Sequence, residues 1–439
     1  MIPISSNYWL KNAQIPACLL SEIVLEQTPN RDGLVNVDLE IVSGSITQIV
    51  SVGTVEIPES ISINLHKKLI FPCFVDVHTH LDKGQIWERN PNADGTFQGA
   101  LQAVWKDIET WHPEDVYRRI EFGLKCSYAH GTKAIRTHLD SGGRLAEMSW
   151  EVLRTLQKEW SERLILQAAS LVSLDYYLTP EGEKLANKVA EFGGILGGVA
   201  YMNPDIDRQI QQTFELAKER ELDLDFHTDE NGEPDSITLK KVAETALKLE
   251  FSGQIVCGHC CSLATQSPQQ IKETIALVKQ AGIGIISLPM CNLYLQDRQY
   301  QQQLTQTPRW RGITLLHELK NAGVPVAIAS DNCRDPFYNF GDHDGLEVFK
   351  MAVRIAHLDH PFGDWPQAVT RTPGEFMGLP TVGKIGVVFS ADLIIFQGRS
   401  FSEVLSRSQH NRIVLRQGKE IDTTLPDYQE LDDLISTII

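Results

Sequence analysis

Two histidines separated by one residue, His78 and His80, follow a short apolar segment of the chain. On an extended strand, residues i and i+2 point to the same face, with their Cα atoms roughly 6–7 Å apart. Two imidazoles at that spacing can bind one metal ion from adjacent directions. A lone pair of this kind also arises by chance, so it predicts a metal site only together with further ligands.

Other side chains that could act as ligands, acids or bases come at the ends of later apolar segments. They are His227, with Glu230 three residues after it, His259 and Asp331. The acidic stretch after His227, "TDENGE", also fits a solvated turn when it is considered alone. Four strand ends that each carry a histidine or a carboxylate instead predict one shared site for metal-dependent chemistry.

These segments belong to a regular alternation of strand-like and helix-like patterns. The predicted strands are residues 74–77, 134–139, 164–171, 195–201, 222–227, 254–259, 282–288 and 324–330. Eight such repeats predict a (β/α)8 TIM barrel, in which the C-terminal ends of the strands meet at one mouth. A two-domain doubly wound fold is the alternative. It is less favoured because no glycine-rich phosphate loop follows any of the strands.

The two ends of the chain have a different pattern. Residues 34–70 alternate apolar and polar side chains between Gly and Ser turns, and this style returns after residue 382. We expect residues 1–70 and 382–439 to form one small β-sandwich from both termini. Residues 71–381 would then form the metal-dependent catalytic barrel.

The composition is that of a globular protein, with 42% hydrophobic and 22% charged residues. The formal net charge of −17 disfavours nucleic acid and anionic membranes as partners. The sequence has no apolar run of the roughly 18 residues that a spanning helix needs. Its start, "MIPISSNYWLKNAQIPACLL", lacks the pattern of a secretory signal. We therefore expect a cytoplasmic protein that binds neither nucleic acid nor membrane.

The eight cysteines show no spacing typical of a disulfide framework. Cys257 and Cys260 form a C-x-x-C within "CGHCC", but no second pair follows. This pattern favours packing at a strand end over a zinc ribbon or a redox site.

Taken together, the motifs resemble those of the amidohydrolase superfamily. The matching stretches, in order and in strand placement, are "FPCFVDVHTHLDK", "HTDE", "GH" and "SDN". Within the superfamily the chain is similar to the cytosine-deaminase-like branch, through "IRTHLD", "WRGITLLHELKNAG" and "DPFYNFG". The closing "GVVFSADLIIF" is similar to the strand that returns amidohydrolase chains to their sandwich. The resemblance runs from about residue 60 to about residue 400.

The resemblance implies a single divalent metal ion. Its ligands would be His78, His80, His227 and Asp331. Such a donor set accommodates Zn2+ or Fe2+, and also Mn2+. Asp229 matches no ligand position, and we expect it to form hydrogen bonds within its loop. His138 is expected to support the site or to pack in the core.

The implied reaction is hydrolytic deamination of an amino-substituted nitrogen heterocycle, such as a cytosine-like pyrimidine or a triazine. A divalent ion makes hydroxide available near neutral pH, and Asp331 would accept the proton of the attacking water. Glu230 would protonate the ring nitrogen and then the departing ammonia, while His259 orients the water. The expected partner is thus a small heterocyclic substrate, and the family also implies a homo-oligomer.

Three expected substrate-binding residues depart from cytosine deaminase itself. Ser173 takes the place of a glutamine, and a hydroxyl cannot provide the paired donor and acceptor of a primary amide. Asn332 replaces a second aspartate, and Phe337 replaces a tryptophan. We therefore expect a ring other than cytosine, such as a substituted pyrimidine, a triazine or a pterin-like ring.

Two other functions remain open. One is hydrolysis of a cyclic amide, as in dihydropyrimidinase-like enzymes with two metals bridged by a carboxylated lysine. The segment "GGILGGVAYMNP" offers no lysine at that strand end, and Lys83 lies on the wrong strand. The other is a catalytically silent scaffold, which is disfavoured because every predicted ligand and Glu230 are present. Residues 97–111 are expected to be a packed helix or a cover over the mouth.

Overall fold

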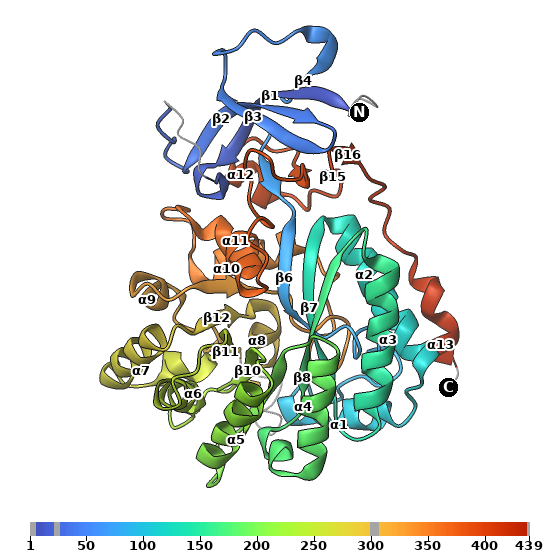
Figure 1. The fold of residues 1–439 in the computed structure, drawn as a ribbon, viewed down its shortest axis with the longest axis vertical. Helices are drawn as coiled ribbons and strands as arrows, with labels where there is room; N and C mark the ends of the chain where they lie inside the picture. Colours follow the sequence, from blue (N-terminus) through green and yellow to red (C-terminus); the bar gives the residue numbers. More distant parts are fainter. Residues whose placement is uncertain (1–5, 22–26, 299–306, 437–439) are drawn as a thin grey trace. The chain divides into compact units, whose positions relative to one another are not determined.

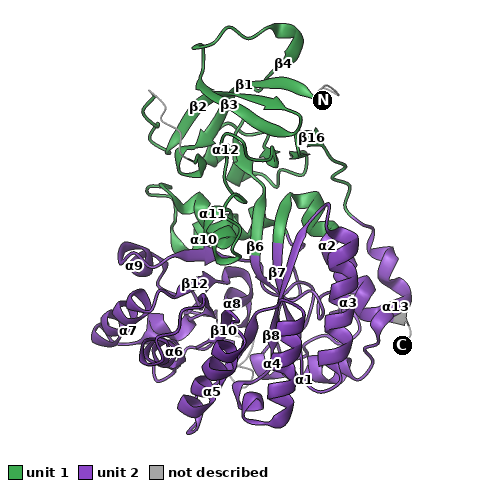
Figure 2. Cartoon of the chain, in the orientation of Figure 1, with its two compact units in different colours: residues 1–76, 125–134, 344–425 green, residues 77–124, 135–343, 426–439 purple. Residues whose placement is uncertain are grey.

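The computed structural model describes residues 6–21, 27–298 and 307–436 of the chain. Residues 1–5, 22–26 and 437–439, which the predicted sandwich includes, lie outside the described residues. The chain divides into two compact units (Figure 2). Unit 1 comprises residues 1–76, 125–134 and 344–425, and unit 2 comprises residues 77–124, 135–343 and 426–439.

All eight predicted barrel strands are present. They are β6 (Phe74–Thr79), β7 (Thr132–Asp140), β8 (Ile165–Leu171), β9 (Leu196–Ala200), β10 (Leu224–Thr228), β11 (Ile255–His259), β12 (Gly284–Ser287) and β13 (Val326–Ile328). One sheet has the order β6-β7-β8 and the other β9 to β13 in sequence. Parallel bridges from Ala169 to Ile195 and from Thr79 to Asp331 join the edges of these sheets. The strands therefore close into a ring, which confirms the predicted (β/α)8 barrel.

The strands are buried on both faces, as expected where helices cover a parallel sheet. Every residue of β10 and of β11 is buried. Helices α3 to α7 lie outside the strands (Figure 1). Two of these helices begin with a residue that caps the first turn and with Pro in the first turn: Thr179 before α4, and Ser267, in a capping box, before α7.

The helices connect the strands in chain order. They are α1 (Phe97–Ile108), α2 (Pro113–His130), α3 (Leu145–Trp160), α4 (Pro180–Glu191), α5 (Ile206–Glu219), α6 (Thr238–Lys248), α7 (Pro268–Gln280), α8 (Pro289–Leu295), α9 (Leu316–Asn321), α10 (Gly345–Ala356), α11 (Arg371–Phe376), α12 (Phe401–Ser406) and α13 (Asp432–Ser436). The short 3-10 helices are η1 (Ala17–Leu19), η2 (Glu59–Ile61), η3 (Leu174–Leu178), η4 (Cys261–Thr265), η5 (Trp365–Val369) and η6 (Tyr428–Leu431). Among the described residues, no helix combines the length and the apolar character needed to span a bilayer.

Two four-stranded sheets in unit 1 are built from both ends of the chain. The strands are β1 (Asn7–Pro16), β2 (Leu34–Val42), β3 (Ser45–Ser51), β4 (Ser62–Asn64), β5 (Ile70–Pro72), β14 (Leu393–Ile395), β15 (Ile413–Arg416) and β16 (Lys419–Glu420). Their orders are β3-β2-β1-β4 and β16-β15-β14-β5. Leu10, Val37 and Leu39 share one hydrophobic core with Leu393 and Leu415. The predicted β-sandwich is therefore confirmed, whereas its exact boundaries stay a prediction.

A buried charge network holds the segment that follows β6. Arg89 donates to Asp107 at 2.9 and 2.7 Å and to Asp115 at 2.6 Å. Arg119 donates to the other oxygen of Asp115 at 2.7 Å. Arg119 also donates to the carbonyl of Asp82. The network therefore fixes the backbone just after the histidine pair.

Asp115→Asn is expected to lower the free energy of unfolding by about 3–5 kcal/mol at pH 7, because the buried guanidinium of Arg119 loses its carboxylate and that of Arg89 loses one of two. Burial alone would raise the pKa of Asp115, but Arg119 and Arg89 lower it to about 2. A carboxyl whose folded pKa lies below its unfolded pKa stabilises above the unfolded value, and that contribution is lost as pH falls towards 2. Urea unfolding of wild type and of Asp115→Asn should therefore show a difference in the free energy of unfolding at pH 7, and this difference should be smaller at pH 3. Asp433→Asn, which removes the exposed partner of Arg118, is the control and should change little at either pH.

Candidate active site

The C-terminal ends of five barrel strands bring histidines and a carboxylate together. β6 carries His78 and is followed by His80, and β7, β10 and β11 carry His138, His227 and His259. Asp331 follows β13 and is fully buried. The exposed fraction of each of these histidines is at most 5%. The predicted ligands therefore share one buried location.

The distances relate the four predicted ligands to one another. His80 Nε2 lies 3.1 Å and His78 Nε2 lies 3.6 Å from Asp331 Oδ1. His227 Nε2 lies 3.3 Å from His80 Nε2. The Asp331 backbone N–H donates to the His78 carbonyl at 2.9 Å, and Thr79 Oγ1 donates to the Asp331 carbonyl at 2.8 Å. These bonds between the ends of β6 and the segment after β13 place the carboxylate beside the histidine pair.

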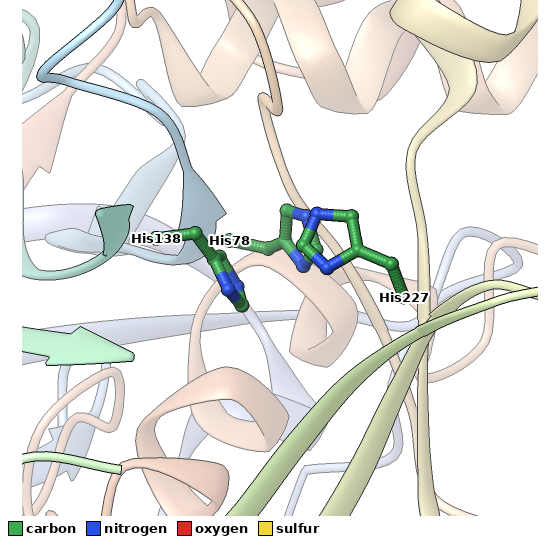
Figure 3. A group of neighbouring side chains, drawn as sticks. All are labelled: His78, His138 and His227. Atoms are coloured by element: carbon green, nitrogen blue, oxygen red, sulfur yellow. The ribbon is translucent and has the colours of Figure 1, made fainter. Parts of the chain in front are cut away.

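Two groups of side chains that could hold a metal share His78. One group is His78, His80 and Asp331, and the other is His78, His138 and His227. Figure 3 shows the three rings of the second group gathered in one place. The ring centroids of His138 and His227 lie 4.0 and 4.5 Å from that of His78. From the sequence, His138 was expected to support the site or to pack in the core. The structure places its ring in direct contact with the predicted ligands.

The chemistry of these side chains fits a divalent ion. Burial, followed by the charges of neighbouring histidines and of Arg136, holds the pKa of His78 well below its ordinary value. The pKa values of His80, His138 and His227 are lowered in the same direction, again mainly by burial. Neutral imidazoles have a free lone pair, which is what a metal ion requires.

The hydrogen bonding of the histidine rings also favours a metal ion. Among the residues that the structure describes, neither ring nitrogen of His78 has a hydrogen-bond partner, and the same holds for both ring nitrogens of His138. Buried polar atoms without partners are unfavourable unless a ligand satisfies them. The buried His/Asp cluster is therefore suited to a divalent metal.

Strained backbone marks the same strand ends. His259 has φ +67° and Asp331 has φ +63°, in the left-handed region that side chains other than glycine rarely adopt. Such conformations persist where the surrounding structure enforces them, and they cluster at functional sites. The backbone thus supports the location that the side chains indicate.

Glu230 and His259 form a second cluster beside the first. His259 Nδ1 lies 3.3 Å from Glu230 Oε1. Asn292 on α8 donates from Nδ2 to Glu230 Oε1 at 3.3 Å and contacts His259 Nδ1 at 3.0 Å. With Asn292 as donor, Nδ1 of His259 accepts, so the ring proton of His259 is on Nε2. Asn292 was not predicted from the sequence.

The environment of Glu230 favours its neutral form. Burial, and next the charge of Asp331, raise the pKa of Glu230 well above its ordinary value, against the opposing charge of Lys83. A carboxyl group whose pKa is raised is better suited to donate a proton near neutral pH. Glu230, Cys291 and Asp331 also form a third group of possible ligand atoms.

Asp229 has a different role from its neighbours. Its Oδ1 accepts hydrogen bonds from the backbone N–H and Oγ1 of Thr238, at 2.8 and 2.7 Å, and its Oδ2 accepts from the N–H of Leu239 at 2.9 Å. These bonds satisfy the first turn of α6. The expectation that Asp229 forms loop hydrogen bonds is confirmed.

A cavity of about 540 Å³ opens beside these clusters. Its lining includes His80, His227, Glu230, His259 and Asp331. The three predicted substrate-binding residues, Ser173, Asn332 and Phe337, also line it. Helix α1, the predicted helix or cover, contributes an apolar wall of Phe97, Leu101, Trp105 and Ile108. The cavity lining thus combines the polar side chains of the two clusters with apolar side chains of α1.

The match to known proteins extends over nearly the whole chain. The Amidohydrolase family profile matches residues 98–421. A pterin deaminase of Rhizobium rhizogenes (strain K84) is 47% identical over 435 residues, which cover 99% of this chain and 98% of that protein. N-isopropylammelide isopropyl amidohydrolase of Pseudomonas sp. (strain ADP) is 22% identical over 82% of this chain and 87% of that protein.

The fold is that of solved deaminases. The crystal structure of 5-methylcytosine deaminase from Klebsiella pneumoniae with 5-fluorocytosine aligns with a TM-score of 0.80 and 22% identity, over 96% of this chain and 98% of that one. The predicted activity class, hydrolytic deamination of an amino-substituted nitrogen heterocycle, is confirmed by the comparison with the deaminase that is 47% identical. The chain belongs to the amidohydrolase family, as its strand-end motifs predicted.

Proposed function

We propose that this chain hydrolyses the exocyclic amino group of a pterin-like ring, a 2-amino-4-oxo bicycle, and releases ammonia. The observation that carries this choice of ring is the 47% identity to a pterin deaminase over 99% of the chain. The cavity supports it, because about 540 Å³ leaves room for a bicyclic ring with a substituent. Ser173 supports it too, since this position lacks the amide that would read cytosine.

We assign His78, His80, His227 and Asp331 as the ligands of one divalent ion, Zn2+ or Fe2+ in the first place and Mn2+ in the second. The 3.1 Å and 3.3 Å contacts of His80 with Asp331 and His227 support this set. When bound, such an ion lowers the pKa of water so that hydroxide is available at neutral pH.

The side chains around that position divide the proton transfers among them. Asp331 accepts the proton of the attacking water. His259 keeps its ring proton on Nε2 and orients the water through it. Glu230 protonates the ring nitrogen next to the amino-bearing carbon, and then carries a second proton to the leaving ammonia. Asn292 positions Glu230 and His259 relative to each other.

Pterin is expected to be deaminated with a kcat/KM at least roughly 10²-fold above that of cytosine, because Ser173 has no amide to pair with cytosine. The test is an ammonia-release screen of pterins, aminopyrimidines, aminotriazines and aminopurines, with protein whose metal has been quantified. A cyclic amide such as dihydrouracil is the control for ring-opening and should remain intact. Equal or faster turnover of cytosine, or ring-opening without ammonia, would contradict the proposal.

A further inference from the structure

An ion pair lies within the cavity rather than on the outside of the barrel. Lys83 Nζ lies 2.9 Å from Asp140 Oδ2, and the two side chains are 5% and 19% exposed. Lys83 follows β6, and Asp140 is the last residue of the neighbouring strand β7. Both line the cavity together with Glu230. A buried ion pair adds little to stability once its desolvation is counted, so its position there calls for another explanation.

Lys83 is charged, and the pair is held in place. Burial opposes the charge of Lys83, but Asp140 and Asp82 raise its pKa to about 12. The backbone N–H of Asp140 donates to Asp82 Oδ2 at 2.7 Å, which fixes the end of β7. An ammonium has three N–H donors and a carboxylate has about four acceptor sites, so one mutual contact leaves capacity on both. The pair therefore presents a donor and an acceptor side by side.

The surroundings suit a flat ring placed against this pair. Lys83 Nζ lies 5.7 Å from the centroid of the Phe337 ring, which lines the cavity with Tyr201. Glu230, the proposed proton donor, lines the same cavity as the pair. A substrate edge bound by the pair would thus lie near the atoms that react.

We propose that Lys83 and Asp140 together bind the lactam edge of the substrate ring. Lys83 donates to the ring carbonyl oxygen, and Asp140 accepts from the adjacent ring N–H. The assignment rests on the proposed pterin deamination and deepens it. It provides the donor and acceptor that Ser173 cannot.

The geometry of a 2-amino-4-oxo ring agrees with this role. Its amino-bearing carbon is bonded to the lactam nitrogen, so binding of the lactam edge fixes the reacting carbon one bond away. A 2,4-diamino ring reverses the edge, since it presents an amino group to Lys83 and a bare ring nitrogen to Asp140. Two repulsive contacts replace two hydrogen bonds, and such a reversal gives strong discrimination.

The test compares pterin with 2,4-diaminopteridine in metal-quantified, full-length protein. Wild type should prefer pterin by roughly 10²-fold or more in kcat/KM. Lys83→Met and Asp140→Asn should each lower kcat/KM for pterin by about 10–100-fold, mainly through KM, and reduce this preference. Lys241→Met is the matched control, because Lys241 pairs with Asp207 on the outer helices at 2.7 Å, and it should leave both substrates unchanged.

Binding of lumazine, the deaminated product, provides a readout that needs no turnover. Lumazine keeps the lactam edge, so its Kd should rise by about 10–100-fold in Lys83→Met and in Asp140→Asn. Circular dichroism and metal content identify a variant that fails to fold. If Lys83→Met fails to fold, the test rests on Asp140→Asn, which keeps the shape of the side chain. Unchanged pterin preference and lumazine Kd in a folded variant would overturn this assignment. Failure of wild type to deaminate any pterin would instead overturn the proposed function.

Discussion

Glu230→Gln is expected to lower kcat for deamination by roughly 10²–10⁴-fold, the usual contribution of a positioned acid or base. Glutamine keeps the size of the side chain and can still contact His259 and Asn292, which lie 3.3 Å from Glu230 Oε1. It cannot give up or take back a proton, so the ring nitrogen and the leaving ammonia remain unprotonated. The measurement is kcat with pterin, together with metal analysis of the same preparation.

The metal analysis separates a proton carrier from a ligand. Glu230 is proposed to lie outside the coordination shell, so Glu230→Gln should bind as much metal as wild type. Glu233→Gln, an exposed carboxylate three residues later, is the matched control and should keep full activity. Turnover that survives in Glu230→Gln would refute the proton-carrier role, and loss of the metal would refute its place outside the shell.

The barrel could be predicted from sequence because its strands are buried on both faces. Such strands appear as short apolar runs whatever the details of their neighbours, and all eight were found. Strand β1 was not predicted. Its register with β2 shifts between Leu10 and Ala13, so the alternation of apolar and polar residues changes phase there. A bulge of this kind removes the period of two on which the prediction of a strand depends.

The residues of the site also divide into those that a local sequence pattern marks and those that only tertiary contacts bring together. His78, His80, His227 and Asp331 could be located because the ends of parallel strands meet at one mouth, whatever the loops do. Asn292 lies on α8 and has no pattern that marks it, because its contact with Glu230 depends on how that helix packs. The pairing of Lys83 with Asp140 joins residues 57 positions apart (140 − 83) at the ends of two strands. Neither contact could be derived from spacing alone.

His227→Asn is expected to lose most of the bound metal and, with it, nearly all deaminase activity, whereas His138→Asn keeps the metal. The two histidines are both buried and both belong to a group that contains His78. They differ in their partners. His227 Nε2 lies 3.3 Å from His80 Nε2, which in turn lies 3.1 Å from the Asp331 carboxylate, so this side of the cluster offers a negative charge to a cation. His138 Nε2 lies 3.7 Å from Asp225.

The role of His138 follows from the ion pair that Asp225 forms. Asp225 accepts from Arg136 at 3.0 Å, so its charge is already compensated by a buried guanidinium. His138 lies beside this compensated carboxylate rather than beside the charge of Asp331, so it is expected to support the ligands, and its loss to lower metal affinity by roughly 10–100-fold rather than to abolish binding. Metal content after dialysis against a chelator, measured beside circular dichroism for both variants, distinguishes the two roles. If His138→Asn loses the metal and His227→Asn retains it, the ion uses a ligand set that includes His138, and the assignment of the ion to His78, His80, His227 and Asp331 is wrong.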